Sequence, residues 1–314
     1  MPILIRHAKT SEDLDEILKL RYEGLVYEGA LLSREIQAIG KSVDHLDIFP
    51  DTLNFFALVK GQVRAALRAV SYSLSDPTMN FVFNYKEAFL GLQKKTALLD
   101  HLVLSSDLGL PIECTVGLIK AALLQLSHLG YSAVFMSVPK HFLSAVTTIG
   151  FIPVAEESMN NWVDDVVAPC VLDLEKYVAQ VFSAVVDKEI LKFRELFTLT
   201  LFEPGELLAV QGEKGQTAYL IENGSVEVVL SKEETLSSLA ELKKGQLIGE
   251  LAMITREART ASLVAKEMTT CYSIDRIDFL NLLQEEPYRS LDLFKICSKR
   301  LEAVNKRLAT VRAP

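Results

Sequence analysis

The stretch GELAMITREARTA, from Gly249 to Ala261, places a carboxylate near its start and a guanidinium near its end. Gly249 permits a turn that brings the backbone close to a ligand, and ELAMI predicts a short helix whose first N–H groups form an anion site. Arg259 adds fork-shaped donors that suit phosphate oxygens, and Glu250 adds acceptors that suit a ribose hydroxyl. Taken alone, the pair also fits a strand–turn–strand with two surface charges.

The residues around this stretch predict short antiparallel strands joined by tight turns. Glycines recur between short β-branched runs such as SVEVVL, at Gly205, Gly212, Gly215, Gly224, Gly245 and Gly249. That rhythm is typical of a small barrel or jelly roll. We therefore expect a separate β-roll with flanking helices over 201–314.

This region resembles the cyclic nucleotide-binding domain family. The matching pieces are Pro204-Gly205-Glu206, Gln211-Gly212-Glu213, Ala218-Tyr219-Leu220-Ile221, Gly224-Ser225-Val226, Gly245, Gly249-Glu250-Leu251-Ala252 and Arg259-Thr260-Ala261. The resemblance implies a phosphate-binding cassette in which Glu250 binds the ribose hydroxyl, and Arg259 holds the cyclic phosphate with help from the backbone of Leu251 and Ala252. Ala258 stands where many members carry proline. The candidate nucleotide-binding residues are therefore Gly249, Glu250, Leu251, Ala252, Arg259, Thr260 and Ala261.

The choice of nucleotide base depends on the residue after the arginine. Within the family, a threonine at this place can favour cGMP by reaching the phosphate and the guanine amino group, whereas serine or alanine is common in cAMP binders. Thr260 also fits an ordinary strand residue that faces the roll. We expect cAMP ahead of cGMP, because cAMP is the commoner ligand of such domains.

The C-terminal tail carries one apolar stripe at helical spacing, formed by Leu301, Val304, Leu308 and Val311. The resemblance gives such a helix two roles, as a lid over the base or as a contact with its twin in a homodimer. Simple packing on the roll is the third alternative.

The first part of the chain alternates between strand and helix patterns. We expect strands over 1–8, 96–105 and 132–138, a hairpin over 54–73 that turns at Lys60-Gly61, and helices over 10–28 and 115–130. A short helix within 141–154 leads to a final strand. This order predicts an α+β protein whose first domain covers 1–175 with a mixed sheet, followed by a helical linker over 176–200.

This first part resembles the acyltransferases that make N-acyl amino acids and acyl-homoserine lactones, within the N-acetyltransferase (GNAT) fold. The resemblance rests on Arg21-Tyr22, on Asp44, Asp47 and Asp51, on the hairpin ALVKGQVRAALR with Arg68, and on IGFIPV. It implies that the arginines bind a carboxylate or a carrier phosphate and that nearby carboxylates orient an amine. Histidine is the residue type best suited to proton transfer near neutral pH, and the nearby candidates are His101 and His141. The candidate catalytic residues are Arg21, Asp47, Arg68, Asp100 and His101.

Two departures from the acyltransferase pattern leave several functions open. The expected pyrophosphate loop is LPIECTVGLIKAAL, in which Gly117 has no basic residue before it, and Val146 stands where many members carry a catalytic tyrosine. The first hypothesis is an N-acyltransferase, using acyl-CoA or an acyl carrier protein, that a cyclic nucleotide controls allosterically. The second is a signal-transduction sensor whose first domain is a non-catalytic protein-interaction module. The third makes that domain a ligand-binding partner without transfer chemistry.

Bulk composition narrows the remaining classes. The net charge of −8 argues against a nucleic-acid binder, because neutralising phosphates needs a basic face. The four cysteines have no paired or metal-ligand spacing and lie in apolar surroundings, which predicts reduced core thiols and no metal. The N-terminus lacks a long apolar core, and no apolar run approaches a membrane span. We therefore expect a cytoplasmic location.

Overall fold

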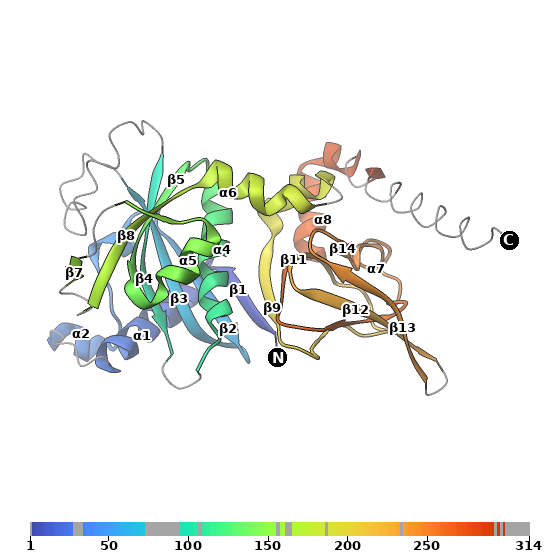
Figure 1. Ribbon diagram of the computed structural model, residues 1–314, viewed down its shortest axis with the longest axis horizontal. Helices are drawn as coiled ribbons and strands as arrows, with labels where there is room; N and C mark the ends of the chain where they lie inside the picture. The colour runs from blue at the N-terminus through green and yellow to red at the C-terminus, as the bar shows by residue number, and fades with distance from the viewer. Residues whose placement is uncertain are drawn as a thin grey trace. The chain divides into compact units, whose positions relative to one another are not determined.

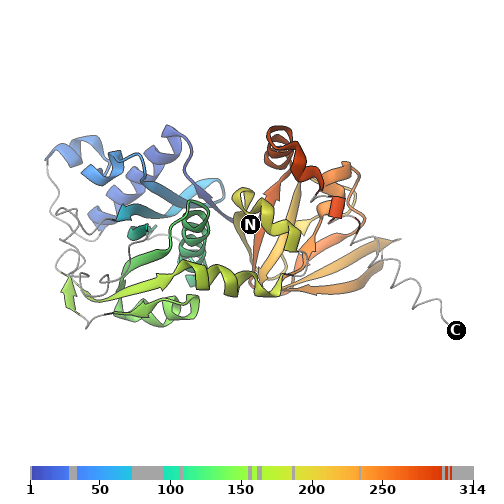
Figure 2. The ribbon, with the colours of Figure 1, turned by 90° about the horizontal axis from the view of Figure 1, so that it is seen from above.

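The chain folds into two compact units in a computed structural model (Figures 1 and 2). The structure describes residues 2–27, 34–72, 95–105, 109–154, 158–160, 165–185, 188–232 and 235–291, together with residues 294, 295 and 298. One unit runs from Ile3 to Val181 and the other begins at Phe182. The change of unit falls within the predicted 176–200 linker, while the predicted apolar stripe over 301–311 lies outside the described residues.

The first unit is built on a mixed sheet in the order β1-β2-β3-β4-β5-β8-β6, with β7 on β8. Neighbouring strands are antiparallel, except that β4 and β5 run parallel. The strands are β1 (Ile3–His7), β2 (Leu53–Val59), β3 (Gln62–Tyr72), β4 (Thr96–Leu104), β5 (Ala133–Pro139), β6 (Ile152–Pro153), β7 (Ser158–Asn160) and β8 (Asp165–Asp173). The predicted hairpin is confirmed, with Lys60 and Gly61 both at positive φ, as a tight type I′ turn requires.

Helices cover the sheet of this unit on both faces. Successive residues of β3 from Ala65 to Val70 are all buried, and successive side chains of a strand point to opposite faces. On one face, Ile17 and Leu20 of α1 pack against Phe56 and Ala66. The helices are α1 (Ser11–Tyr27), α2 (Arg34–Ile39), η1 (His45–Ile48), α4 (Ile112–His128), η3 (Lys140–Phe142), α5 (Leu143–Ile149) and α6 (Leu174–Val181).

The second unit is a β-roll made of two four-stranded sheets. Their orders are β14-β11-β16-β9 and β10-β15-β12-β13, and all neighbours are antiparallel. The apolar core between them includes Phe202, Ile221, Val226 and Cys271. The strands are β9 (Thr198–Phe202), β10 (Leu207–Ala209), β11 (Thr217–Asn223), β12 (Ser225–Lys232), β13 (Thr235–Lys243), β14 (Leu247–Ile248), β15 (Ser262–Ala265) and β16 (Thr269–Asp275).

Short helices flank the roll, as predicted for this part of the chain. They are η4 (Phe182–Ala184), η5 (Lys188–Leu196), α7 (Glu250–Thr255), α8 (Arg276–Glu285) and η6 (Pro287–Arg289). The expected α+β class with a β-roll is thus confirmed. The expectation that the strand in 141–154 ends the first sheet is wrong, because β8 follows it in the chain and lies between β5 and β6.

Candidate functional site

The predicted nucleotide cassette begins at a glycine that the geometry requires. Gly249 has φ +78°, in the left-handed region, and caps the N-terminus of α7. A Cβ at this position would lie 2.5 Å from Nη1 of Arg259. A side chain at this position would therefore strain the backbone turn and would have to displace the neighbouring guanidinium.

Arg259 is buried and its guanidinium points into the cassette. Nη1 donates a hydrogen bond to the carbonyl of Gly249 at 2.6 Å, and Nη2 donates to the carbonyl of Thr217. Burial lowers the pKa of Arg259, and the nearby Tyr219 and Glu250 partly oppose that effect. Glu250 is itself buried, so the predicted carboxylate and guanidinium share one electrostatic environment.

The loop before β11 holds the cassette from the other side. Arg259 N–H donates to the carbonyl of Glu213 at 2.8 Å, and Gly212 N–H donates to the carbonyl of Arg259 at 2.9 Å. A Cβ on Gly215 would lie 2.5 Å from the carbonyl carbon of Ala252 in α7. Gly215 thus allows the backbone of this loop to pack directly against α7.

The remaining predicted cassette residues differ in their exposure. Leu251 and Thr260 are exposed, Ala252 is half-buried and Ala261 is buried. The side chain of Thr260 is therefore accessible to solvent, whereas Ala261 packs in the interior of the roll.

The five predicted catalytic residues gather in one ionic cluster in the first unit. Its centre is Arg68 on β3, whose side chain is fully buried. This guanidinium donates to Asp44 at 2.7 and 3.0 Å, to Asp47 at 2.9 Å and to Asp100 at 2.8 and 2.7 Å. Burial opposes its charge, but the hydrogen bonds that it donates to Asp100 and Asp44 raise the pKa of Arg68 well above its ordinary value.

Arg21 of α1 extends the cluster into the core. Its Nη1 donates to Asp47 at 2.8 Å and its Nη2 donates to the side-chain oxygen of Asn54 at 2.6 Å. Asn54 was not among the predicted site residues, although it pairs with Arg68 in the β2–β3 ladder. The signal available in the sequence for Asn54 was a polar residue in an otherwise apolar strand, opposite an arginine of the same hairpin.

His101 forms the solvent-facing edge of the cluster. Its Nδ1 lies 3.0 Å from Nη2 of Arg68 and 3.3 Å from Oδ2 of Asp100, and its Nε2 lies 3.5 Å from Oδ2 of Asp44. The side chain is 39% exposed. His101 has φ +49° and lies where β4 carries one more residue than β3, which makes a β-bulge that aims the ring. His141, the other candidate, lies in η3.

The carboxylates of Asp44 and Asp100 are ionised at neutral pH. Burial alone would raise the pKa of Asp100, but the hydrogen bonds from Arg68 and His101 lower it to about 2. The pKa of Asp44 is also lowered, because Arg68 outweighs the effect of burial. An imidazole held between two such carboxylates can accept a proton and keep the resulting charge neutralised.

Strands β4 and β5 separate next to this histidine. Their parallel pairing runs from Thr96 with Ala133 to Leu99 with Met136 and ends there, although β4 continues to Leu104 and β5 to Pro139. The last residue of β4 that pairs with β5 is therefore Leu99, which directly precedes Asp100.

The structure retains both departures from the acyltransferase pattern, at the start of α4 and at Val146. Helix α4 begins after Pro111, and its first turn carries Glu113 and no basic residue. Backbone N–H groups at this end attract anions, but a carboxylate beside them weakens that attraction. Val146 is fully buried in α5, so no catalytic group is present at that position.

The described cysteines are buried and carry free thiols, as predicted. Burial raises the pKa of Cys170 to about 11 and that of Cys114 to about 12, and it raises the pKa of Cys271 further. Cys297 lies outside the described residues. Within the part of the chain that the structure covers, no helix is long and apolar enough to cross a membrane, and no group of acidic, histidine or cysteine side chains has the geometry of a metal site.

Comparison with known proteins concerns mainly the second unit. A family model described as cyclic nucleotide-binding domain matches residues 199–286. A cGMP-dependent protein kinase of Plasmodium berghei is 39% identical over 75 residues, which are 24% of this chain and 8% of the kinase. The cyclic AMP receptor protein of Thermus thermophilus is 30% identical over 116 residues, which are 36% of this chain and 52% of that protein.

Two solved structures are similar to parts of the chain. The Thermus thermophilus catabolite activator protein has 27% identity and a TM-score of 0.35, over 42% of this chain and 62% of that one. FeeM, an N-acyl amino acid synthase from uncultured soil microbes, has 13% identity and a TM-score of 0.46, over 57% of this chain and 96% of that one. The chain thus spans less than a tenth of the kinase and about half of the receptor protein. Residues 199–286 are thus similar to the cyclic nucleotide-binding domain family.

Proposed function

We propose that the second unit binds a cyclic nucleotide and thereby controls the first unit, which transfers an acyl group to an amine. The observation that carries the first part is the position of Arg259, buried and directed at the carbonyls of Gly249 and Thr217. A cyclic phosphate offers stronger acceptors than these carbonyls, because hydrogen bonds between charged groups are shorter and stronger than those to neutral oxygens. The phosphate would therefore take over donors that are already in place.

The exposed Thr260 bears on which nucleotide binds, with cAMP expected ahead of cGMP. Calorimetric titration with cAMP, cGMP and linear 5′-AMP tests the assignment, since 5′-AMP keeps the base but lacks the ring phosphate. Substituting Thr260→Ala should weaken cGMP and leave cAMP nearly unchanged. Equal loss of both nucleotides would show that Thr260 contacts only the shared part of the ligand.

In the first unit, the ionic cluster supplies groups for acyl transfer from a thioester. The amine nitrogen attacks the thioester carbonyl carbon, its proton passes to the imidazole of His101, and the carbon–sulfur bond breaks. The departing thiolate then takes up this proton from the imidazolium, which restores the neutral imidazole. Asp44 and Asp100 hold the imidazole in place, and Arg68, which is fully buried, positions these carboxylates rather than contacting substrate.

The acyl donor is a CoA thioester or an acyl carrier protein. The acidic first turn of α4 favours the carrier, because CoA brings a pyrophosphate to a region with no basic residue between Gly109 and Gly117. A transfer assay with both donors and a panel of amines tests the activity. His101→Gln should lower kcat much more than it raises KM, because glutamine cannot accept the proton, whereas its amide is uncharged like the neutral imidazole and leaves the net charge of the cluster unchanged.

The alternative is a sensor whose first unit does not catalyse transfer. The acidic turn at Glu113 and the buried Val146 favour it. Absence of transfer with either donor, in the presence and absence of nucleotide, would leave this second function as the better one.

The route from nucleotide to the linker passes through packed groups of the second unit. Arg276 of α8 donates from Nε to the carbonyl of Met253 in α7 at 2.7 Å, in a buried position. One turn later, the ring of Phe279 lies 5.1 Å from that of Phe193 in η5. Movement of the cassette helix would therefore shift α8 and the linker helix with it.

This route is tested by measuring nucleotide affinity separately from the change in transfer rate that the nucleotide causes. Phe279→Leu should keep nucleotide affinity within about threefold, because Phe279 does not touch the cassette, but should reduce the change in transfer rate that nucleotide causes. Ile277→Ala, an exposed change on the same helix, is the control. An undiminished nucleotide response in Phe279→Leu would exclude this route.

A further inference from the structure

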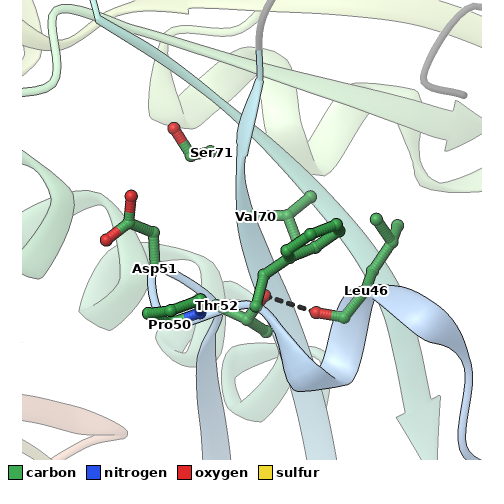
Figure 3. Close-up of a pocket in the computed structure, with 7 residues that line it drawn as sticks. Leu46, Pro50, Asp51, Thr52, Val70 and Ser71 are labelled. Carbon is green, nitrogen blue, oxygen red and sulfur yellow. Dashed lines mark hydrogen bonds between the residues drawn. The ribbon is translucent and has the colours of Figure 1, made fainter. Parts of the chain in front are cut away.

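A cavity of about 180 Å³ opens in the first unit beside the ionic cluster (Figure 3). Its walls come from η1 and the loop after it, and from the end of β3. The residues that line it include Leu46, Phe49, Asp51, Thr52, Val70 and Ser71. Neither the nucleotide cassette nor the transfer chemistry described above uses this cavity.

The cavity has an apolar side and a polar side. Figure 3 shows the carboxylate of Asp51 and the hydroxyl of Ser71 on one side, and Leu46 and Val70 on the other. The hydroxyl of Thr52 donates to the carbonyl of Leu46 at 2.6 Å, so it ties the wall together. A ligand would therefore place its apolar part toward Leu46 and Val70 and its polar end toward Asp51.

The charge on the polar side selects a cation. Asp51 is exposed and makes no hydrogen bond or ion pair with any residue that the structure describes. This contrasts with Asp44, Asp47 and Asp100, whose carboxylates are engaged by Arg68. The carboxylate of Asp51 is thus available to an ammonium group, with Ser71 beside it as a further acceptor.

The volume sets the size of the apolar part. A cavity of about 150 Å³ lined by aliphatic and aromatic side chains takes up benzene. The present cavity has room for one six-membered ring, or a branched alkyl group of that size, with a short connecting chain. We propose that it binds a small primary amine that carries a ring-sized apolar group.

The cavity lies close to the proposed site of transfer. Leu46 comes from the same turn that carries Asp44 and Asp47, and Val70 follows Arg68 by two residues on β3. Residues two apart on a strand face the same side and are about 7 Å apart. If the proposed acyl transfer holds, the bound amine is its acceptor; the binding itself does not depend on that reaction.

The test uses the full chain without any acyl donor. Titration with 2-phenylethylamine, followed by calorimetry or NMR, is compared with 2-phenylethanol, which lacks the charge, and with 3-phenylpropionate, which reverses it. The amine should bind most tightly and the carboxylate least. Asp51→Asn should weaken the amine about threefold to fivefold, as expected for an exposed ion pair, and should leave the alcohol unchanged.

Two further variants complete the experiment. Ser71→Phe should fill the cavity and abolish binding of both amine and alcohol, whereas Glu12→Gln, an exposed carboxylate of α1, should change nothing. Equal affinity for amine and alcohol, or binding that survives both Asp51→Asn and Ser71→Phe, would overturn the assignment. If the amine binds but no acyl transfer is detected, the proposed reaction is refuted and the binding site is not. If transfer occurs at the same rate in Asp51→Asn, the role of the cavity is refuted and the reaction is not.

Discussion

Replacing Arg68 by methionine should strongly destabilise the first unit, because methionine keeps the length of the side chain and removes its charge. Five hydrogen bonds from Arg68 to three carboxylates would be lost, and only Asp47 would keep a guanidinium partner, Arg21. Removing one partner of a buried ion pair costs about 3–5 kcal/mol. For a unit of this size that corresponds to a fall in Tm of about 6–20 °C.

The pH dependence of this loss identifies its cause. In the wild type, the lowered pKa of Asp100 contributes stability that is present above about pH 4 and is lost as the pH falls toward 2. In Arg68→Met, His101 alone opposes the effect of burial, so the pKa of Asp100 rises and the carboxyl takes up a proton at a higher pH. The difference in free energy of unfolding between the two proteins should therefore shrink between pH 7 and pH 4.

Differential scanning calorimetry at several pH values measures both effects. Arg6→Met, an exposed change on β1, is the matched control and should shift Tm little. A loss below about 1 kcal/mol, or a loss that stays constant down to pH 4, would refute the view that Arg68 neutralises buried carboxylates.

Three other changes test the cassette and the turns. Gly249→Ala should destabilise the second unit more than Gly212→Ala. An alanine at either positive φ costs about 1–2 kcal/mol of backbone strain, but only at Gly249 does the new Cβ contact Arg259. Thermal unfolding of the two variants measures the difference. Arg256→Gly should raise the free energy of unfolding by up to about 1 kcal/mol, because Arg256 is an exposed residue with φ +64° at the end of α7, and an unchanged or lower value would contradict that strain. Arg276→Leu should weaken nucleotide binding, whereas Arg276→Lys should partly restore it, and equal affinity in all three proteins would show that the bond to Met253 does not position the cassette.

The sequence predicted most of the elements, because their patterns are local. The turn at Lys60-Gly61, the short helix after Gly249 and the glycine spacing of the roll each depend on neighbouring residues. Strand β8 was missed because Pro169 interrupts its apolar run, and proline is disfavoured inside a sheet. Pro169 pairs with Ser137 in the ladder, and its carbonyl accepts from Val154, so tertiary pairing overrode the local preference.

The two sites were predictable to different degrees. The cassette residues lie within thirteen positions of the chain, so their juxtaposition follows from one turn. The ionic cluster joins α1, η1, β2, β3 and β4, and only the β-bulge and the register bring His101 and Asn54 to Arg68. The sequence suggested the members Arg21, Asp47 and Asp100, but not that Arg68 would be fully buried among them.

Calorimetric titration of the full chain with cAMP and cGMP tests the central claim most directly. The wild type should bind at least one of them, and Arg259→Leu, checked for folding by circular dichroism, should bind it at least a hundredfold more weakly, because two charged hydrogen bonds contribute about 3–6 kcal/mol. A wild type that binds neither nucleotide at millimolar concentration, or a variant that binds as tightly as the wild type, would contradict the account.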